Sequence, residues 1–349
     1  MAAPLLAAVR RNDLDTAVAV LTKAAAEGQI YAGALYVRHR GEVLARSFGA
    51  SKSPDDMFLL ASISKPISVA ALMTLYDKGE FRLDDKVKKF IPEFTGDSRD
   101  KITIRQLLTH VSGLPGILPE FGSLWDRQAK LSEHIARAIR TPLLFEPGSR
   151  YRYANMGILV ACEVAQRISR ADFLEFIDGA LFQPLEMKRS ALGLGRFRLE
   201  EVLRCQPVTK VRPGLDPSAK DWDYNSLYWR KLGAPWAGVH ASAKDVATFF
   251  GEFLYRRGAV LRPETARLMV RNHNRKGLPS RGLGFDVGAG AGSRGCSEAT
   301  FGHTGATGTL AWADPASDTI CIVLTTLPGS EANPHPRKLA SDHVAKAVN

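Results

Sequence analysis

The chain has 349 residues, of which 45% are hydrophobic and 24% are charged, and its formal net charge is +11 at pH 7. This balance is typical of a globular protein and excludes an intrinsically disordered chain. No apolar run reaches the ~18 residues that a membrane-spanning helix needs, so no membrane partner is expected. The basic residues are spread along the chain without a dense block, so the charge indicates no nucleic-acid partner.

The first residues predict an amphipathic helix, because apolar side chains recur at helical spacing as far as Leu21. Charged residues follow a short apolar stretch at once, which is unlike a signal peptide, so we expect a cytoplasmic protein. Four cysteines are far apart and form no Cys-x-x-Cys pair: Cys162, Cys205, Cys296 and Cys321. We expect reduced core thiols here, and neither a disulfide framework nor a zinc site.

The strand signals lie at the two ends of the chain and the helix signals lie between them. A hairpin is predicted at 33–39 and 42–48, two strands at 308–315 and 319–326, and a final helix after 334. Helices are predicted at 63–78, 104–110, 132–140, 157–169 and 171–179, with Pro/Gly-bearing loops at 113–122 and 212–223. The pattern predicts an α+β fold, in which both chain ends form one antiparallel sheet flanked by helices. We expect one domain over 1–349, with an α/β part at about 1–61 and 240–349 and an inserted, mostly helical part at about 62–239.

A serine precedes a lysine by three residues at the start of the helix predicted after residue 62. Pro66 falls in the first helical turn, where a missing N–H does no harm, so Ser62 sits at or just inside the helix N-terminus. Residues three apart share a helical face, so Lys65 can reach the Ser62 hydroxyl and act as the base that a serine nucleophile needs. Taken alone, the pair fits a helix cap and a solvated lysine better.

A second polar group follows a Pro-Gly turn, where Tyr153 and Asn155 lead into a helix. A tyrosine near cationic groups loses or relays a proton more easily, so Tyr153 is a candidate general base. The Asn155 amide is a candidate donor to a substrate carbonyl. The simpler explanations are a core tyrosine and a helix N-cap, and taken alone these simpler explanations are the better ones.

A third group, His303, Thr304 and Gly305, is predicted to precede a strand. Glycine at this place allows a close approach of backbone to ligand. The Ala306 N–H, on the strand that follows, is a candidate for half of an oxyanion hole, with the Ser62 N–H as the other half. The alternative is a glycine-rich turn that carries a surface histidine.

The order Ser-x-x-Lys, Tyr-x-Asn, His-Thr-Gly resembles the serine β-lactamase and penicillin-binding-protein superfamily. It is most similar to the class C β-lactamase-like branch, which includes family VIII carboxylesterases and D-stereospecific aminopeptidases. Further segments resemble this branch in order: "ITIRQLLTHVSGLP", "FEPGSRYRYANMG", "PLEMKRS", "GAPWAGVHASAKDVATFF" and "GLGFDV". The resemblance covers about residues 29–326 and is specific as a joint pattern, although each motif alone is weak.

The resemblance implies a β-lactamase/transpeptidase-like fold and a role for each residue of the three motifs. Ser62 is the acylated nucleophile, Lys65 assists its deprotonation, and Tyr153 is the base or shares that role. The other residues are expected to bind substrate: Asn155, His303, Thr304, Gly305 and Ala306. No metal or cofactor is implied. Whether Lys65 or Tyr153 takes the proton stays open, because coupled groups titrate together.

One position departs from the β-lactamase pattern, because those members usually carry a lysine where this chain has His303. A histidine near neutral pH is mostly uncharged, so it binds a substrate carboxylate less well. We therefore expect hydrolysis of small carboxylic esters. β-Lactam or D-amino-acid amide hydrolysis and acyl transfer are the alternatives, and a non-catalytic binding protein is a weaker one. The specificity surface is expected in two loops with four tryptophans, Trp125, Trp222, Trp229 and Trp236, which core packing explains equally well.

Overall fold

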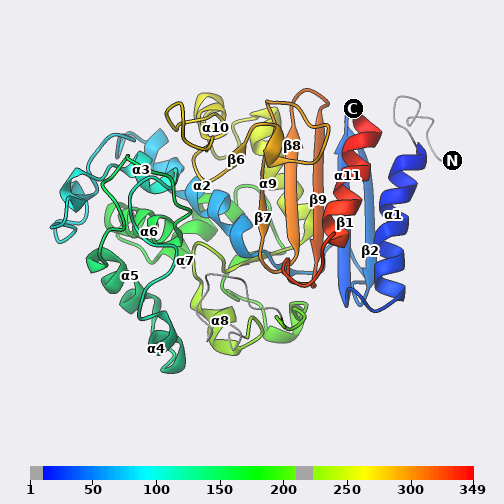
Figure 1. The fold of residues 1–349 in the computed structure, drawn as a ribbon, viewed down its shortest axis with the longest axis horizontal. Helices are drawn as coiled ribbons and strands as arrows, with labels where there is room; N and C mark the ends of the chain where they lie inside the picture. The colour runs from blue at the N-terminus through cyan, green and yellow to red at the C-terminus, as the bar shows by residue number, and fades with distance from the viewer. Residues whose placement is uncertain (1–10, 210–222) are drawn as a thin grey trace.

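The structure is a computed structural model that describes residues 11–209 and 223–349. Its main sheet has six antiparallel strands in the order β2-β1-β9-β8-β7-β6 (Figure 1). The strands are β1 (Ala32–His39), β2 (Glu42–Gly49), β6 (Asp286–Val287), β7 (Phe301–Gly305), β8 (Thr309–Asp314) and β9 (Thr319–Thr325). β1 lies between β2 and β9, so both ends of the chain build one sheet. The predicted α+β fold is confirmed.

The sheet separates two layers of helices, because successive side chains of a strand point to opposite faces. In β1, Ala34 joins one hydrophobic cluster, whereas Leu35 and Val37 join the other. α9 (Ala243–Tyr255) covers the face of Ala34, and α1 (Arg11–Ala26) and α11 (Pro336–Val348) lie side by side on the opposite face (Figure 1). The β1–β2 turn has positive φ at Arg40 and Gly41, 48° and 90°, which suits a two-residue hairpin.

The helical region lies beside the sheet, at the β6–β7 side (Figure 1). Its helices are α2 (Ser64–Asp77), α3 (Ile104–Leu108), α4 (Phe121–Asp126), α5 (Leu131–Arg140), α6 (Asn155–Ser169), α7 (Phe173–Ile177) and α8 (Leu227–Leu232), with α10 (Pro263–Met269) above β6. A second sheet, in the order β3-β5-β4, joins Phe58–Leu59, Val239–Ala241 and Ser190–Leu192. Shorter helical turns are η1 (Ala61–Ile63), η2 (Val87–Lys89), η3 (Arg99–Lys101), the π-helical η4 (Asp178–Phe182), η5 (Leu199–Glu201) and η7 (Ala289–Ala291).

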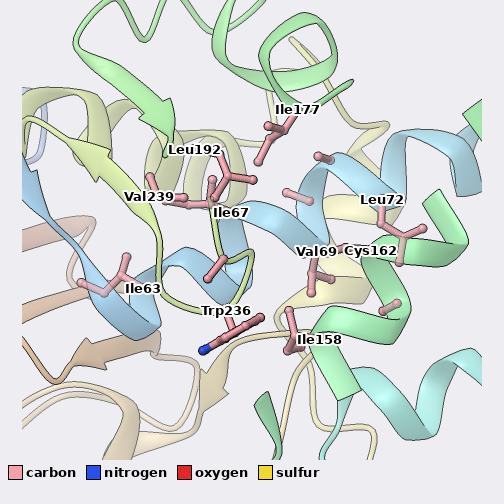
Figure 2. Close-up of a cluster of buried hydrophobic side chains, with 14 of the residues drawn as sticks. Ile63, Ile67, Val69, Leu72, Ile158, Cys162, Ile177, Leu192, Trp236 and Val239 are labelled. Carbon is pink, nitrogen blue, oxygen red and sulfur yellow. The ribbon is translucent and has the colours of Figure 1, made fainter. Parts of the chain in front are cut away.

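α2 is buried along nearly its whole length, from Ser64 to Leu75. Figure 2 shows side chains from α2, such as Val69 and Leu72, packed against α6 and the small sheet. A helix that is apolar on all sides belongs in a core, and such a helix is fixed on every face. The residues at its first turn are therefore held in a rigid setting away from bulk water.

Several predicted boundaries differ from the structure. The helix predicted at 171–179 is α7 (Phe173–Ile177) followed by η4. The helices α4, α8 and α10 and the small sheet were not predicted because these elements are short, and α9 was not predicted either. His303, Thr304 and Gly305 precede β8, as predicted, but they lie inside β7, a strand that we did not predict. Ala306 lies in the turn between β7 and β8 and not on a strand. The loop predicted at 212–223 falls outside the described residues, except for its last residue.

The four cysteines are buried and unpaired with one another, so the prediction that they belong to the core is confirmed. Among the residues that the structure describes, no helix combines the length and the apolar character that crossing a membrane requires.

Candidate active site

Ser62 lies in η1, directly before α2, and lines a cavity of about 300 Å³. The preceding Ala61 has φ of +48°, a left-handed conformation that costs a residue with a Cβ about 1–2 kcal/mol. The fold around it sustains this strain, because η1 leads into a buried helix and the neighbouring Leu60 carbonyl accepts a hydrogen bond from Thr309 of β8. The backbone thus places Ser62 in the lining of the cavity.

The Lys65 amine is fully buried and contacts the serine directly. Its Nζ lies 2.9 Å from Ser62 Oγ and 2.9 Å from the carbonyl oxygen of Trp236. Burial, and after it the positive charge of Arg281, lowers the Lys65 pKa well below the ordinary value of 10.5. A neutral amine keeps an N–H for the Trp236 carbonyl and a lone pair for the serine proton. Lys65 is therefore equipped to be the base.

The Tyr153 side chain lines the same cavity as Ser62, and Lys65 Nζ lies 4.7 Å from the centre of its ring. Burial raises the Tyr153 pKa to about 12, although the Ser62 hydroxyl and Arg281 act in the opposite direction. We expected neighbouring cations to ease loss of the phenol proton, but burial outweighs them. Tyr153 thus keeps its proton at neutral pH and serves better as a donor or relay.

His303 has both ring nitrogens engaged within the protein. Nε2 lies 2.9 Å from Nη2 of Arg281, and Nδ1 lies 2.8 Å from the carbonyl oxygen of Thr304. A guanidinium only donates, so Nε2 must accept and the ring proton sits on Nδ1. Burial, followed by the charge of Arg281, lowers the His303 pKa well below 6.5, so the ring is neutral. Thr304 is exposed beside it, and both residues line the cavity.

Two hydrogen bonds join the turn after β7 and the start of β8 to Leu59 and Leu60, just before Ser62. Thr307 Oγ1 donates to the Leu59 carbonyl at 2.6 Å, and Thr309 Oγ1 donates to the Leu60 carbonyl at 2.8 Å. A Cβ at Gly305 would lie 2.1 Å from the Leu60 carbonyl oxygen, so only glycine permits this approach.

These hydrogen bonds hold Ala306 and Ser62 at the same cavity. Ser62 lies in the first turn of η1, where backbone N–H groups lack intrahelical acceptors. The N–H groups of Ser62 and Ala306 remain our candidate oxyanion hole.

Asn155 is half-buried at the start of α6, two residues after Tyr153. It is not among the residues that line the cavity, so its role in orienting substrate stays a prediction. Within residues 11–209 and 223–349, no group of three or more His, Cys, Asp or Glu side chains is placed to bind a metal ion.

The sequence did not single out several residues that the fold brings to the site. Tyr151, Arg281, Asp286 and Arg337 line the cavity, and Arg281 forms an ion pair with Asp286. His110 is buried with its ring centre 4.6 Å from that of Tyr153, and its Nδ1 accepts a hydrogen bond from the Ala154 N–H at 3.2 Å.

His110 is thus a second histidine beside the site, which the sequence analysis did not single out. The segments "ITIRQLLTHVSGLP" and "GLGFDV" contain or adjoin three of these residues, so the family-like segments were the available signal.

The tryptophans are divided between core and surface. Trp229 and Trp236 are buried, each 5% exposed, so core packing is the correct explanation for these two. Trp125 is half-buried, with its ring centre 5.4 Å from that of Trp229. Trp222 lies outside the described residues. The predicted specificity surface is therefore not built from the buried pair.

Comparison with known proteins decides the family, because residues 17–346 match the family described as Beta-lactamase. The chain belongs to the Beta-lactamase family. The predicted membership of the serine β-lactamase and penicillin-binding-protein superfamily, and the predicted fold, are thereby confirmed.

This Beta-lactamase family member is similar to several characterised or solved proteins. It is 33% identical over 196 residues to esterase EstB of Burkholderia gladioli, an alignment that covers 52% of this chain and 48% of EstB. The chain thus spans about half the length of that curated relative. Two solved structures share the fold: EstCE1, described as a hydrolase with promiscuous acyltransferase activity, with a TM-score of 0.77 and 22% identity over 96% of this chain and 99% of that chain; and D-amino acid amidase from Ochrobactrum anthropi SV3, with a TM-score of 0.79 and 20% identity over 96% and 99%.

Proposed function

We propose that this protein is a serine hydrolase that forms an acyl-enzyme on Ser62 and hydrolyses small carboxylic esters. One observation carries the proposal: a fully buried lysine amine lies 2.9 Å from a serine hydroxyl in the lining of a cavity. A buried lysine with a lowered pKa has little structural purpose, because neutralising or burying its charge costs stability. Perturbed titratable groups in clefts are therefore candidates for catalysis.

Acylation begins when Lys65 Nζ takes the proton of Ser62 Oγ and the oxygen attacks the ester carbonyl carbon. The carbonyl oxygen becomes an oxyanion, which the N–H groups of Ser62 and Ala306 stabilise. The tetrahedral intermediate then expels the alkoxide, which receives a proton from the Tyr153 hydroxyl. The Tyr153 hydroxyl is in turn reprotonated by the proton that Lys65 took from Ser62, so both groups return to their starting states. The products of this stage are a free alcohol and acyl-Ser62.

Deacylation uses the same groups in the reverse order. A water molecule loses its proton to Lys65 and attacks the acyl carbon. Ser62 Oγ leaves and recovers a proton, which releases the carboxylic acid. An alcohol or amine in place of water gives acyl transfer with the same residues, and an amide in place of the ester gives amide hydrolysis.

Two observations favour esters over β-lactams. The His303 ring is neutral and engages both nitrogens within the protein, so the ring offers no charge to the carboxylate that a β-lactam carries, and the neighbouring Arg281 is already ion-paired with Asp286. The cavity of about 300 Å³ suits a small substrate. The similarity to esterase EstB supports the same choice.

The proposal is tested with a chromogenic short-chain ester. Wild-type protein is expected to release the alcohol in a burst followed by a slower steady rate, because the acyl-enzyme accumulates. Ser62→Ala is expected to lower turnover by about 10⁴-fold or more. Intact-mass spectrometry after a fluorophosphonate probe should show one adduct on wild type and none on Ser62→Ala.

Ser132→Ala is the matched control, because Ser132 is an exposed serine of α5 away from the cavity. It should keep both the burst and the adduct. Near wild-type turnover in Ser62→Ala contradicts the assignment of the nucleophile, and absence of the adduct on wild type favours a binding protein without acyl-enzyme chemistry.

A further inference from the structure

Arg281 is the charged side chain around which the catalytic groups are arranged. It is 3% exposed, although a guanidinium is among the groups least often buried. Its fork ion-pairs with Asp286 and lies 2.9 Å from Nε2 of His303, and its Cζ lies 5.4 Å from the ring centre of Tyr153. The Arg281 side chain thus lies beside both Tyr153 and His303, two residues that line the cavity.

The backbone of Arg281 is fixed without help from its side chain. Its N–H donates to Oδ1 of Asn272 at 3.0 Å, and its carbonyl accepts from the N–H of His273 at 2.8 Å. These two backbone bonds do not involve the side chain. A buried charge that is paired with a carboxylate in the lining of a cavity is a candidate for a function of the charge itself.

The neighbouring histidine shows what that function is. His303 occupies the position where β-lactamases usually have a lysine, but this ring is neutral and its Nε2 is an acceptor. The fixed positive charge that contacts this ring is therefore that of Arg281. The planar fork also determines which nitrogen of His303 carries the proton, and so fixes the ring against the backbone of Thr304.

We propose that Arg281 is a positioning residue of the active site, which orients His303 and Tyr153 and supplies a fixed positive charge to the Ser62–Lys65 pair. This inference rests on the proposed function, because its readout is the reactivity of Ser62. It adds to that function a residue that acts through its neighbours and does not touch the reacting atoms.

The effect of the Arg281 charge on the Lys65 pKa has a sign that experiment can test. The titratable or charged groups around Lys65 and the cavity are Tyr153, Tyr151, His110, His303, Arg281, Asp286 and Arg337. Of these, Arg281 acts on Lys65 to lower its pKa, and both histidines are neutral through burial. Removing the guanidinium removes a repulsion from the protonated Lys65 amine, so the Lys65 pKa should rise. The base then becomes available only at higher pH.

The test follows the rate at which a fluorophosphonate probe labels Ser62 as a function of pH, read by intact mass on the full chain. Wild type should show a rate that rises with pH to a plateau. In Arg281→Gln the rising limb should move to higher pH, and the rate at neutral pH should fall about tenfold to a hundredfold. Arg281→Lys keeps the positive charge but loses the planar guanidinium. The rising part of its pH profile should therefore stay at the wild-type pH, while the labelling rate at the plateau falls.

Arg267→Gln is the matched control, because Arg267 is an exposed arginine of α10 that does not line the cavity. Its labelling rate should rise over the same pH range as that of wild type and reach the same plateau. If the labelling rate of Arg281→Gln rises over the same pH range as that of wild type, the proposal is overturned, even if the variant is less stable. If Arg281→Gln does not fold, Arg281→Lys decides: a plateau equal to wild type overturns the positioning role, and a lowered plateau with an unmoved limb supports it. Failure of wild type to be labelled at any pH refutes the proposed function instead.

Discussion

At the scale of single residues, the candidate site consists of side chains whose charge states are set by burial. Lys65 is the clearest case, since a lysine in water is protonated at neutral pH and this one has no carboxylate partner among the described residues. The same burial that disfavours the ammonium raises the pKa of the Tyr153 phenol to about 12. Burial therefore moves the pKa values of the proposed base and the proposed acid in opposite directions, because one group is a cation when charged and the other an anion.

Lys65 should leave a signature in the pH dependence of stability. Its pKa is lowered in the folded state and close to 10.5 in the unfolded state, so between these values the unfolded chain binds more protons. The destabilisation that Lys65 causes is thus complete below the folded pKa and disappears as the pH rises towards 10.5. We expect Lys65→Met to be most favourable relative to wild type at low pH and to lose this advantage as the pH rises.

The measurement is urea unfolding of both proteins at several pH values, with the difference in unfolding free energy as the readout. Lys78→Met is the control, because Lys78 is exposed just after α2 and should give a difference that does not change with pH in this way. A constant difference between wild type and Lys65→Met means that the Lys65 pKa is not lowered by folding.

At the scale of elements, the site depends on how closely β7 approaches η1. An added Cβ at Gly305 meets the Leu60 carbonyl oxygen and Thr309 Oγ1, each at 2.1 Å, and neither is the end of a flexible chain. We expect Gly305→Ala to push the β7–β8 turn away from Ser62. The cost in stability should be about 1–3 kcal/mol, and labelling of Ser62 should fall further than stability does, because the Ala306 N–H moves with the turn.

Gly290→Ala is the control for this substitution, because a Cβ there meets nothing within 4 Å and its φ is not in the left-handed region. It should change the free energy of unfolding by less than about 0.5 kcal/mol. Thermal unfolding and the probe-labelling rate are measured on both variants. Wild-type labelling in a folded Gly305→Ala protein contradicts the placement of the oxyanion hole beside this strand.

The elements also show how far sequence reasoning reached. A long apolar run closed by Gly79 predicted α2, and two short apolar runs on either side of Arg40–Gly41 predicted the β1–β2 hairpin. The three motifs predicted which residues meet at Ser62, and the fold places Lys65, Tyr153 and His303 around it.

β7 was not predicted, because its "FGHTG" is glycine-rich for close packing against Leu60, and such a run suggests a turn. Arg281 was not found for a different reason. Its partners His303 and Tyr153 are distant in the chain, and only the fold brings them within reach.

At the scale of the whole molecule, the active site is assembled from segments that the sheet brings together from far apart in the chain. β1 pairs with β9, and α1 packs beside α11 on the same face (Figure 1). The first and last elements therefore support β9 and β8, and β8 pairs with β7, whose His303, Thr304 and Gly305 line the cavity. Any interaction that joins the two ends contributes to the integrity of the site without approaching it.

The ends are joined by an ionic contact whose contribution should depend on pH. Lys346 Nζ of α11 lies 2.8 Å from Oδ1 of Asp13 in α1, with His343 at 3.7 Å. The Lys346 bond lowers the Asp13 pKa below 3.8, with a smaller contribution from His343 and an opposing one from burial. A carboxyl with a lowered folded pKa stabilises the fold above its unfolded pKa, and this stabilisation is lost as the pH falls through the folded value. We expect Asp13→Asn to lower the Tm at neutral pH and to match wild type near pH ~2. Asp15→Asn, on the exposed side of α1, should leave the Tm unchanged at both pH values. A Tm deficit of Asp13→Asn that persists undiminished in acid would show that packing, and not charge, joins the two ends of the chain.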